Sequence, residues 1–245
     1  MKLRHPEVFM AIQTGVSTQV LGEPGITKTR TMEAFAKYMQ RLFSCVIPSQ
    51  RDPADIVGYP AINEVEMWDG TRRKVADFVP ARWRVEMENS VQHGYKGGLV
   101  LLDEMLDCSP AHQAAIQQVL NDGIPNCWVV GCGNPVECST NGYQQSAPII
   151  NRVCCLDYSC PTEEWKQNII AGFKPQDIAF PVLADSWELH IPEARAMVVS
   201  YLEKHASEVH KLPKTEAEKG KPCPLREAGR MRRRCWLPAR GTGGR

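Results

Sequence analysis

The stretch that decides the fold runs from Gln19 to Thr29 and reads QVLGEPGITKT. A short β-type run leads into a loop with two glycines, and apolar spacing typical of a helix begins at Thr31. A phosphate-binding loop needs glycines so that backbone N–H groups can surround the phosphate oxygens. It also needs a lysine for the phosphates, a hydroxyl for Mg²⁺, and a helix whose amino end faces the anion. The order of strand, loop and helix therefore predicts such a loop here.

This loop departs from the usual pattern GxxxxGK[ST] at one position, because Thr27 stands where the pattern has glycine. If that position requires a positive φ, a β-branched residue is strained there by about 1–3 kcal/mol. Taken alone, an ordinary Gly/Pro turn that contains Lys-Thr is the alternative interpretation. The residues that we expect to contact a nucleotide are Gly22, Pro24, Gly25, Ile26, Thr27, Lys28 and Thr29.

Two acidic residues follow the clearest strand of the sequence. Residues 97–102 (GGLVLL) form a continuous apolar run, as expected for a parallel strand covered on both faces, and Asp103 and Glu104 come next. Ligand sites of open α/β sheets lie at the carboxyl ends of strands. Asp103 is thus a candidate for holding Mg²⁺ together with Thr29, and Glu104 for polarising an attacking water. A strand that runs into a solvated loop is the alternative, but a phosphate loop about 75 residues earlier weakens it.

Two more polar residues occur in chain order after these. In residues 129–135 (VVGCGNP), Asn134 follows a strand and could orient the water, although Asn-Pro is also a common turn initiator. Arg152 precedes the apolar run 153–158. A lone arginine is usually a solvated charge, so its interpretation rests on its position after the other three motifs.

Strands that alternate with helices predict an α/β fold with a mainly parallel sheet. Expected helices cover residues 31–43 and 110–122, the second with Ser109 as the capping residue. Further strands are expected near 45–48, 127–131 and 153–158. Residues 51–88 are expected to form loops and a small hairpin near 73–78. After Cys160 the pattern becomes helical, with an amphipathic face over residues 194–205.

Length and composition set the domain plan. The 245 residues, 43% of them apolar, suit an α/β core (1–160), a helical region (161–221) and a basic tail (222–245). A net charge of +1 gives no global attraction to nucleic acid or acidic membranes. We expect a cytoplasmic protein, because no apolar run approaches the ~18 residues that span a bilayer and no signal-peptide core is visible. The ten cysteines show no CxxC pair, so reduced core thiols are favoured over a zinc site.

Together these motifs resemble the MoxR-like branch of the AAA+ ATPases. GEPGITKT is similar to its Walker A loop, LVLLDE to its Walker B strand, VVGCGNP to its sensor-1 segment, and APIINRVCCLDY to the segment that carries an arginine finger. Residues 55–60 (DIVGYP) and 107–123 (DCSPAHQAAIQQVLNDG) also look like stretches of this family. The resemblance covers roughly residues 10 to 200.

The resemblance implies a P-loop NTPase three-layer sandwich followed by a helical lid, with ATP and Mg²⁺ as ligands. Lys28 would contact the phosphates, Thr29 and Asp103 would hold the metal, and Glu104 would be the catalytic base. Asn134 would position the water, and Arg152 would act on the nucleotide of a neighbouring subunit. It also implies a hexameric ring that remodels a partner protein, which often carries a von Willebrand factor A domain.

The carboxyl-terminal segment departs from the family. The family lid carries a sensor-2 arginine, often within Pro-Ser-Pro-Arg-Ser-Trp, and this chain has no such stretch. One DNA encoding of residues 223–231 (CPLREAGRM), read from its third base, gives Pro-Ser-Pro-Arg-Ser-Trp-Glu-Asn. We therefore hypothesise a shifted reading frame near Lys221, in which case Arg226 has no sensor-2 role and the lid is incomplete. A genuine basic tail is the alternative.

Two other functions stay open at this point. Thr27 and the incomplete lid favour a nucleotide-binding module that does not hydrolyse ATP. A DNA-handling AAA+ motor would need a basic stripe in the core, and the core sequence has none.

Overall fold

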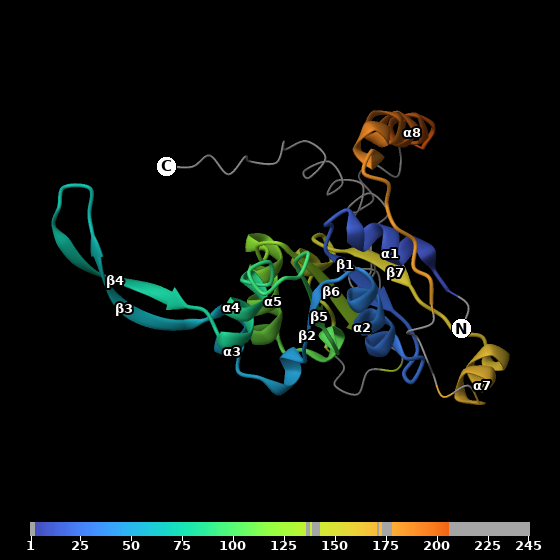
Figure 1. Cartoon of the computed structure of the whole chain (residues 1–245), viewed down its shortest axis with the longest axis horizontal. Helices are drawn as coiled ribbons and strands as arrows, with labels where there is room; N and C mark the ends of the chain where they lie inside the picture. The colour runs from blue at the N-terminus through green and yellow to red at the C-terminus, as the bar shows by residue number, and fades with distance from the viewer. Residues whose placement is uncertain (1–2, 136–137, 139–142, 171, 173–177, 206–245) are drawn as a thin grey trace.

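A parallel β-sheet forms the centre of the molecule (Figure 1). The computed structural model describes residues 3–135, 138, 143–170, 172 and 178–205. Five strands pair in parallel in the order β2-β5-β6-β1-β7. Their bounds are Thr18–Leu21 (β1), Leu42–Val46 (β2), Gly98–Leu102 (β5), Cys127–Gly133 (β6) and Cys154–Asp157 (β7). All five residues of β5 are buried, which agrees with its unbroken apolar sequence.

Helices cover both faces of this sheet and so complete three layers (Figure 1). One face carries α1 (Pro6–Gln13) and α2 (Lys28–Tyr38). The opposite face carries four helices: α3 (Pro53–Val57), α4 (Arg82–Glu88), α5 (Pro110–Asp122) and α6 (Ala147–Ile150). Short 3-10 helices at Pro48–Gln50 (η1) and Met105–Asp107 (η2) lie beside them.

The side chains of strand β5 belong to two hydrophobic cores, one on each face of the sheet. Successive side chains of a strand point to opposite faces. Leu99 and Leu101 therefore pack with α1 and α2, whereas Val100 and Leu102 pack with the helices of the other face. A strand with both faces covered cannot alternate apolar and polar residues, which is why its sequence reads GLVLL.

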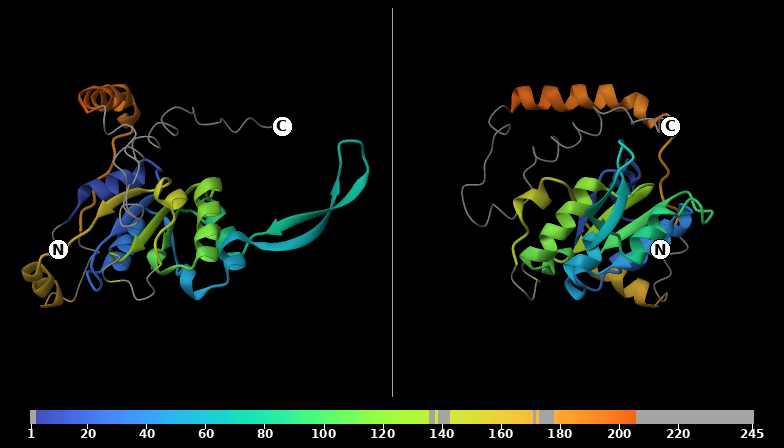
Figure 2. Two further views of the ribbon diagram at one scale, coloured as in Figure 1. Left: turned by 180° about the vertical axis from the view of Figure 1, so that it is seen from behind. Right: turned by 90° about the vertical axis from the view of Figure 1, so that its left-hand side faces the viewer.

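A two-stranded antiparallel hairpin connects α3 to α4 and extends away from the sandwich (Figures 1 and 2). It consists of β3 (Tyr59–Glu66) and β4 (Arg72–Val79), with Tyr59 opposite Val79 and Glu66 opposite Arg72. Most of its side chains are exposed, and Trp68 at the tip is 96% exposed. The hairpin therefore contributes little to either core.

In the described residues after β7, the chain forms α7 (Thr162–Ile170), the 3-10 helix η5 (Trp187–His190) and α8 (Ile191–Lys204). Helix α8 stands apart from the sandwich (Figure 2), and none of its residues is buried. The amphipathic face expected over residues 194–205 is thus not buried in a core. The hypotheses on the tail, including Lys221 and Arg226, fall on residues outside the described ranges.

The α/β class and the parallel sheet predicted from the sequence are confirmed, but several element bounds were wrong. Strand β2 was expected near residues 45–48 and covers Leu42–Val46. Helix α2 ends at Tyr38 instead of Phe43, because Gln40 adopts φ 56° and a left-handed turn closes with bonds from Gln40 N to Lys37 O and from Arg41 N to Ala36 O. This is a Schellman ending without its usual glycine, so the sequence carried no stop signal. The hairpin spans residues 59–79, not only the region near 73–78.

Helix α5 begins at Pro110 as expected, but Ser109 does not cap it. The Ser109 hydroxyl pairs with His112 Nδ1 at 2.7 Å instead of accepting a bond from a backbone amide.

Among the helices in the described ranges, none combines the length and the apolar character needed to cross a bilayer.

Candidate functional site

The carboxyl ends of β5, β6 and β1, three neighbouring strands, bring most of the predicted residues together. Thr29 Oγ1 donates a hydrogen bond of 2.6 Å to Asp103 Oδ2. Lys28 Nζ donates one of 3.0 Å to Asn134 Oδ1. These contacts join three motifs of the sequence, of which the first and the last, at Lys28 and Asn134, are 106 positions apart. The edge of the sheet therefore gathers a cation, a hydroxyl, a carboxylate and an amide at one place.

The loop between β1 and α2 makes its final turn with left-handed residues. Gly25 has φ 80° and Thr27 has φ 65° and ψ 28°, after which α2 begins at Lys28. The first amides of a helix have no partner within the helix and carry a partial positive charge. Thr27 thus does occupy the conformation that the sequence pattern reserves for glycine, and the strain considered from the sequence applies.

Lys28 is buried, with 9% of its surface exposed. Its ammonium group donates to Gly22 O at 2.6 Å and to Glu23 O at 2.9 Å, in addition to the bond with Asn134. Three donors are all that an ammonium group has, so each one is used. Burial lowers the pKa of Lys28, and the charges of nearby groups, including the Asp103 carboxylate, oppose this shift. The loop therefore wraps around its own lysine.

Gly22 is needed for packing and not for its backbone angles. Its N–H donates to Gly133 O at 3.2 Å, while Tyr158 N donates to the preceding residue, Leu21, at 2.6 Å. A Cβ on Gly22 would lie 2.1 Å from Tyr158 O, closer than any atom can approach. The start of the loop is therefore held between β6 and β7.

Asp103 and Glu104 face different surroundings. Asp103 continues the strand with a bond from its N–H to Val46 O at 2.9 Å, and its Oδ1 accepts from Glu104 N at 3.0 Å. Glu104 has φ 54°, a left-handed conformation, and its side chain is exposed. Nothing in the sequence indicated this backbone turn, which separates two adjacent carboxylates and leaves only Asp103 in contact with Thr29.

Arg152 does not join this group. It lies just before β7, at the amino end of a parallel strand and hence at the opposite edge of the sheet from Lys28 and Asp103. Its guanidinium contacts Asn121 Oδ1 of α5 and donates to Pro148 O of α6 at 2.7 Å. Within one copy of the chain, Arg152 has no contact with the loop at residues 22–29 that the structure shows.

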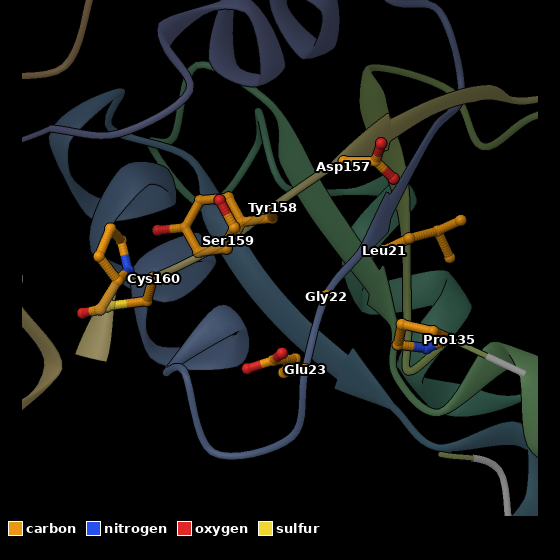
Figure 3. A pocket seen from close by; sticks show the side chains of 9 residues that line it. Leu21, Gly22, Glu23, Pro135, Asp157, Tyr158, Ser159 and Cys160 are labelled. Carbon is orange, nitrogen blue, oxygen red and sulfur yellow. The ribbon is translucent and has the colours of Figure 1, made fainter. Parts of the chain in front are cut away.

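A hollow of about 340 Å³ opens beside the loop (Figure 3). The end of β1 and the start of the loop line it on one side, and the end of β7 with the segment that follows lines it on another, while Pro135 after β6 completes the lining. The lining residues are Leu21, Gly22, Glu23, Pro135, Asp157, Tyr158, Ser159, Cys160 and Pro161. Sequence reasoning placed residues 157 and 158 in an expected strand and did not single out residues 159–161. The available signal was their place at the carboxyl end of a strand, which puts them at the same edge as the other residues.

Comparisons with known proteins add little to this geometry. No protein-family model matches the chain, and no curated protein matches its sequence. Among solved structures, the chain is similar to a crystal structure, at 2.00 Å resolution, of a "putative ATPase" from Cytophaga hutchinsonii ATCC 33406, with a TM-score of 0.43 and 17% sequence identity. The likeness covers 77% of this chain and 61% of that one. The function proposed below rests on the contacts at the edge of the sheet.

Proposed function

We propose that this chain binds Mg²⁺ and ATP at the carboxyl edge of its sheet and hydrolyses the nucleotide as a P-loop ATPase of the AAA+ type. The contact between Thr29 Oγ1 and Asp103 Oδ2 supports this proposal most, because it joins the expected phosphate loop to the expected metal-binding strand. The buried ammonium of Lys28 beside the amide of Asn134 supports it further. The phosphates of ATP carry the negative charge that the Lys28 ammonium can bind.

The donor set suits Mg²⁺. The Thr29 hydroxyl and the Asp103 carboxylate are hard oxygen ligands, and Mg²⁺ usually takes only one or two protein ligands beside water and phosphate oxygens. In the described residues, no group of three or more His, Cys, Asp or Glu side chains forms a fuller metal cage. A bound Mg²⁺ would neutralise charge on the phosphates, while Thr29 and Asp103 fix its place.

The remaining steps belong to side chains and amides of the chain. The amides of residues 25–29 and the amino end of α2 would bind phosphate oxygens, and Lys28 would exchange its carbonyl partners for them. Asn134 would orient the attacking water, and Glu104 would accept its proton. Positioning and charge stabilisation make up most of the catalysis of phosphoryl transfer.

A second candidate is a nucleotide-binding switch that does not hydrolyse ATP. The left-handed Thr27 favours it, because strain in the loop can displace the amides that hold the phosphates. A DNA-handling motor is a weaker candidate, which undetectable DNA binding at low salt would exclude.

The finer parts of the proposal come from the resemblance of the motifs. They are the MoxR-like type, the plan of core, lid and tail, a hexameric ring, remodelling of a partner protein with a von Willebrand factor A domain, and a role of Arg152 in trans. The place of Arg152 at the far edge of the sheet supports the last of these, because within its own subunit it contacts α5 and α6 and not the loop.

Calorimetric titration with Mg·ADP tests the binding site. Replacing Lys28 with Met should weaken binding about tenfold to a hundredfold, since a charged group loses its contacts with phosphate. Lys37→Met is the matched control, because Lys37 is exposed on the same helix and should leave the affinity unchanged. Wild-type protein that binds no nucleotide would contradict the whole proposal.

Phosphate release then separates the two candidates. If the chain is an ATPase, Glu104→Gln should slow steady-state release well below the wild-type rate while it retains Mg·ADP binding. Equal rates at the background level in both proteins would favour the switch that does not hydrolyse ATP.

A further inference from the structure

We propose that Trp165 is a positioning residue for the phosphate loop: its indole N–H holds the Gly25 peptide in the orientation that presents the next amide to phosphate. This inference rests on the proposed function. Trp165 lies on α7, and its Nε1 donates a hydrogen bond of 3.2 Å to Gly25 O. The two residues are 140 positions apart, so this contact joins two elements that the sequence does not connect.

Because of the geometry of the peptide bond, this contact also sets the direction of the next amide in the loop. The described part of the chain contains no cis peptide, and in a trans peptide the C=O of one residue and the N–H of the next point in opposite directions. When Gly25 O is held toward Trp165, the N–H of Ile26 points away from Trp165. A phosphate wrapped by the loop needs amides that point inward while the carbonyls point outward. Trp165 therefore fixes the direction of the Ile26 amide without touching the ligand.

The bond from Trp165 matters because glycine itself does little to restrict the backbone conformation at Gly25. Its φ of 80° is in the left-handed region, and a Cβ at this position would meet no atom within 4 Å. Glycine populates several backbone regions at similar cost, so no side chain restricts the backbone angles at this position. The bond from Trp165 is the contact that the structure provides for the Gly25 carbonyl.

Helix α7 is itself held in place by the neighbouring residue. Glu164 forms a two-point contact with Arg4, including a bond of 2.6 Å from Arg4 Nε to Glu164 Oε1. Arg4 also donates to Ser159 O at 3.1 Å, at the hollow beside the loop. The side chains of Arg4 and Glu164 are only 16% and 23% exposed, so solvent screens this ion pair less than a surface pair. Arg4 and Glu164 thus hold in place the helix that carries Trp165.

The test compares two phosphate ligands by calorimetry on the full chain: Mg·ADP and Mg·pyrophosphate. Trp165→Phe keeps an aromatic ring but removes the indole N–H, and we expect the Kd of both ligands to rise about three- to tenfold. Trp83→Phe is the matched control, because Trp83 Nε1 also donates to a backbone carbonyl, Asp55 O at 2.8 Å, far from the loop. This control should leave both affinities unchanged.

A second variant and a kinetic measurement distinguish positioning from simple destabilisation. Arg4→Ala should weaken the binding of both ligands, but to a smaller extent, because it loosens α7 and does not remove the indole N–H. In Trp165→Phe, KM for Mg·ATP should rise while kcat stays within about twofold, since the Ile26 amide binds the phosphates in the ground state and the transition state alike. A protein that had merely lost active molecules would show a lower kcat.

Two other results would overturn the inference. Weaker binding of Mg·ADP with unchanged binding of Mg·pyrophosphate would mean that Trp165 contacts the base and not the loop. Unchanged affinity for both ligands would mean that the bond to Gly25 has no role. Wild-type protein that binds neither ligand would instead overturn the proposed function on which the inference rests.

Discussion

Thr27 combines a β-branched side chain with φ 65° and ψ 28°, directly before α2. Branching at Cβ makes the left-handed region costly, by about 1–3 kcal/mol. Helix α2 helps to hold Thr27 in place, because Thr27 O accepts bonds from Thr31 N at 3.0 Å and from Thr31 Oγ1 at 2.9 Å. The folded state therefore carries strain in the loop that would hold the phosphates.

Replacing Thr27 with glycine should relieve this strain. We expect the free energy of unfolding to rise by about 1 kcal/mol, because glycine adopts positive φ without a steric penalty and the bonds that Thr27 O accepts do not involve the Thr27 side chain. Urea denaturation measures this change. The control is Arg30→Gly, on the exposed side of the first turn of α2, which should lower the stability by up to about 1 kcal/mol. A Thr27→Gly variant no more stable than the wild type would show that no strain is stored there.

Cys108 shows how a buried thiol makes stability depend on pH. It lies between η2 and α5 and is fully buried, and burial raises its pKa from 9.0 to about 12. Between pH 9 and 12 the unfolded chain would lose this proton while the folded chain keeps it. The unfolded state then binds fewer protons, so stability falls as the pH rises, by up to about 1.4 kcal/mol per unit for one such group.

The variant Cys108→Ala isolates this contribution. We expect the free energy of unfolding to fall less steeply in the variant than in the wild type above pH 9, with parallel curves below that pH. Urea denaturation at pH 7.5, 8.5, 9.5 and 10 measures both curves. Parallel curves over the whole range would mean that the thiol ionises as easily in the folded chain as in the unfolded one.

At the scale of elements, the β3–β4 hairpin is joined to the sandwich only at its base. Gly58 precedes β3 with φ 125°, and a Cβ there would lie 2.8 Å from Val79 O. Beyond this point the side chains on the two strands are nearly all exposed. An isolated hairpin of this kind is marginally stable in water, so the outer part of the hairpin should be energetically independent of the core.

Shortening the hairpin tests this independence. Replacing residues 62–76 with Asn-Gly, a pair that forms tight hairpin turns, should change the free energy of unfolding by less than about 1 kcal/mol. The contrasting variant is Gly58→Ala, which should lose more than about 1 kcal/mol because both the backbone angle and the space forbid a side chain. A large loss of stability in the shortened protein would mean that the outer strands support the core.

The same elements show what the sequence could predict. Strand β5 and the end of β6 were clear, since buried parallel strands have continuous apolar sequences and Asp103 and Asn134 follow them directly. The end of α2 was missed because Gln40 adopts a left-handed angle without glycine. The hairpin was underestimated because an exposed strand has no apolar alternation to detect. The contact of Trp165 with Gly25 could not be predicted at all, since it depends on the packing of distant elements.

At the scale of the whole molecule, the arrangement of the sheet separates two parts of the proposed catalytic machinery. Lys28, Thr29 and Asp103 lie at the carboxyl edge, whereas Arg152 precedes the amino end of β7. An arginine that stabilises the transition state must reach the transferred phosphate. If Arg152 has this role, it must do so at the site of another copy, and the single chain would be an incomplete enzyme.

Mixing two inactive variants tests this arrangement. Lys28→Met impairs the nucleotide site but keeps Arg152, while Arg152→Ala keeps the nucleotide site and removes the arginine. Each alone should release phosphate far more slowly than the wild type, by about 10³-fold for the arginine. In an equal mixture, half of the subunits have an intact nucleotide site, and half of those have a neighbour with Arg152. The mixture should therefore recover about a quarter of the wild-type rate, whatever the size of the ring.

Two controls make this result interpretable. Light scattering with Mg·ADP must show that both variants assemble as the wild type does, because a variant that stays monomeric cannot complement another. Mixing either variant with itself must give no gain. If the mixed rate equals only the sum of the two separate rates while mixed rings form, Arg152 does not act between subunits. If Arg152→Ala alone keeps the wild-type rate, the transition state needs no arginine from this position, and the bonds of Arg152 to α5 and α6 would then serve only to hold those helices together.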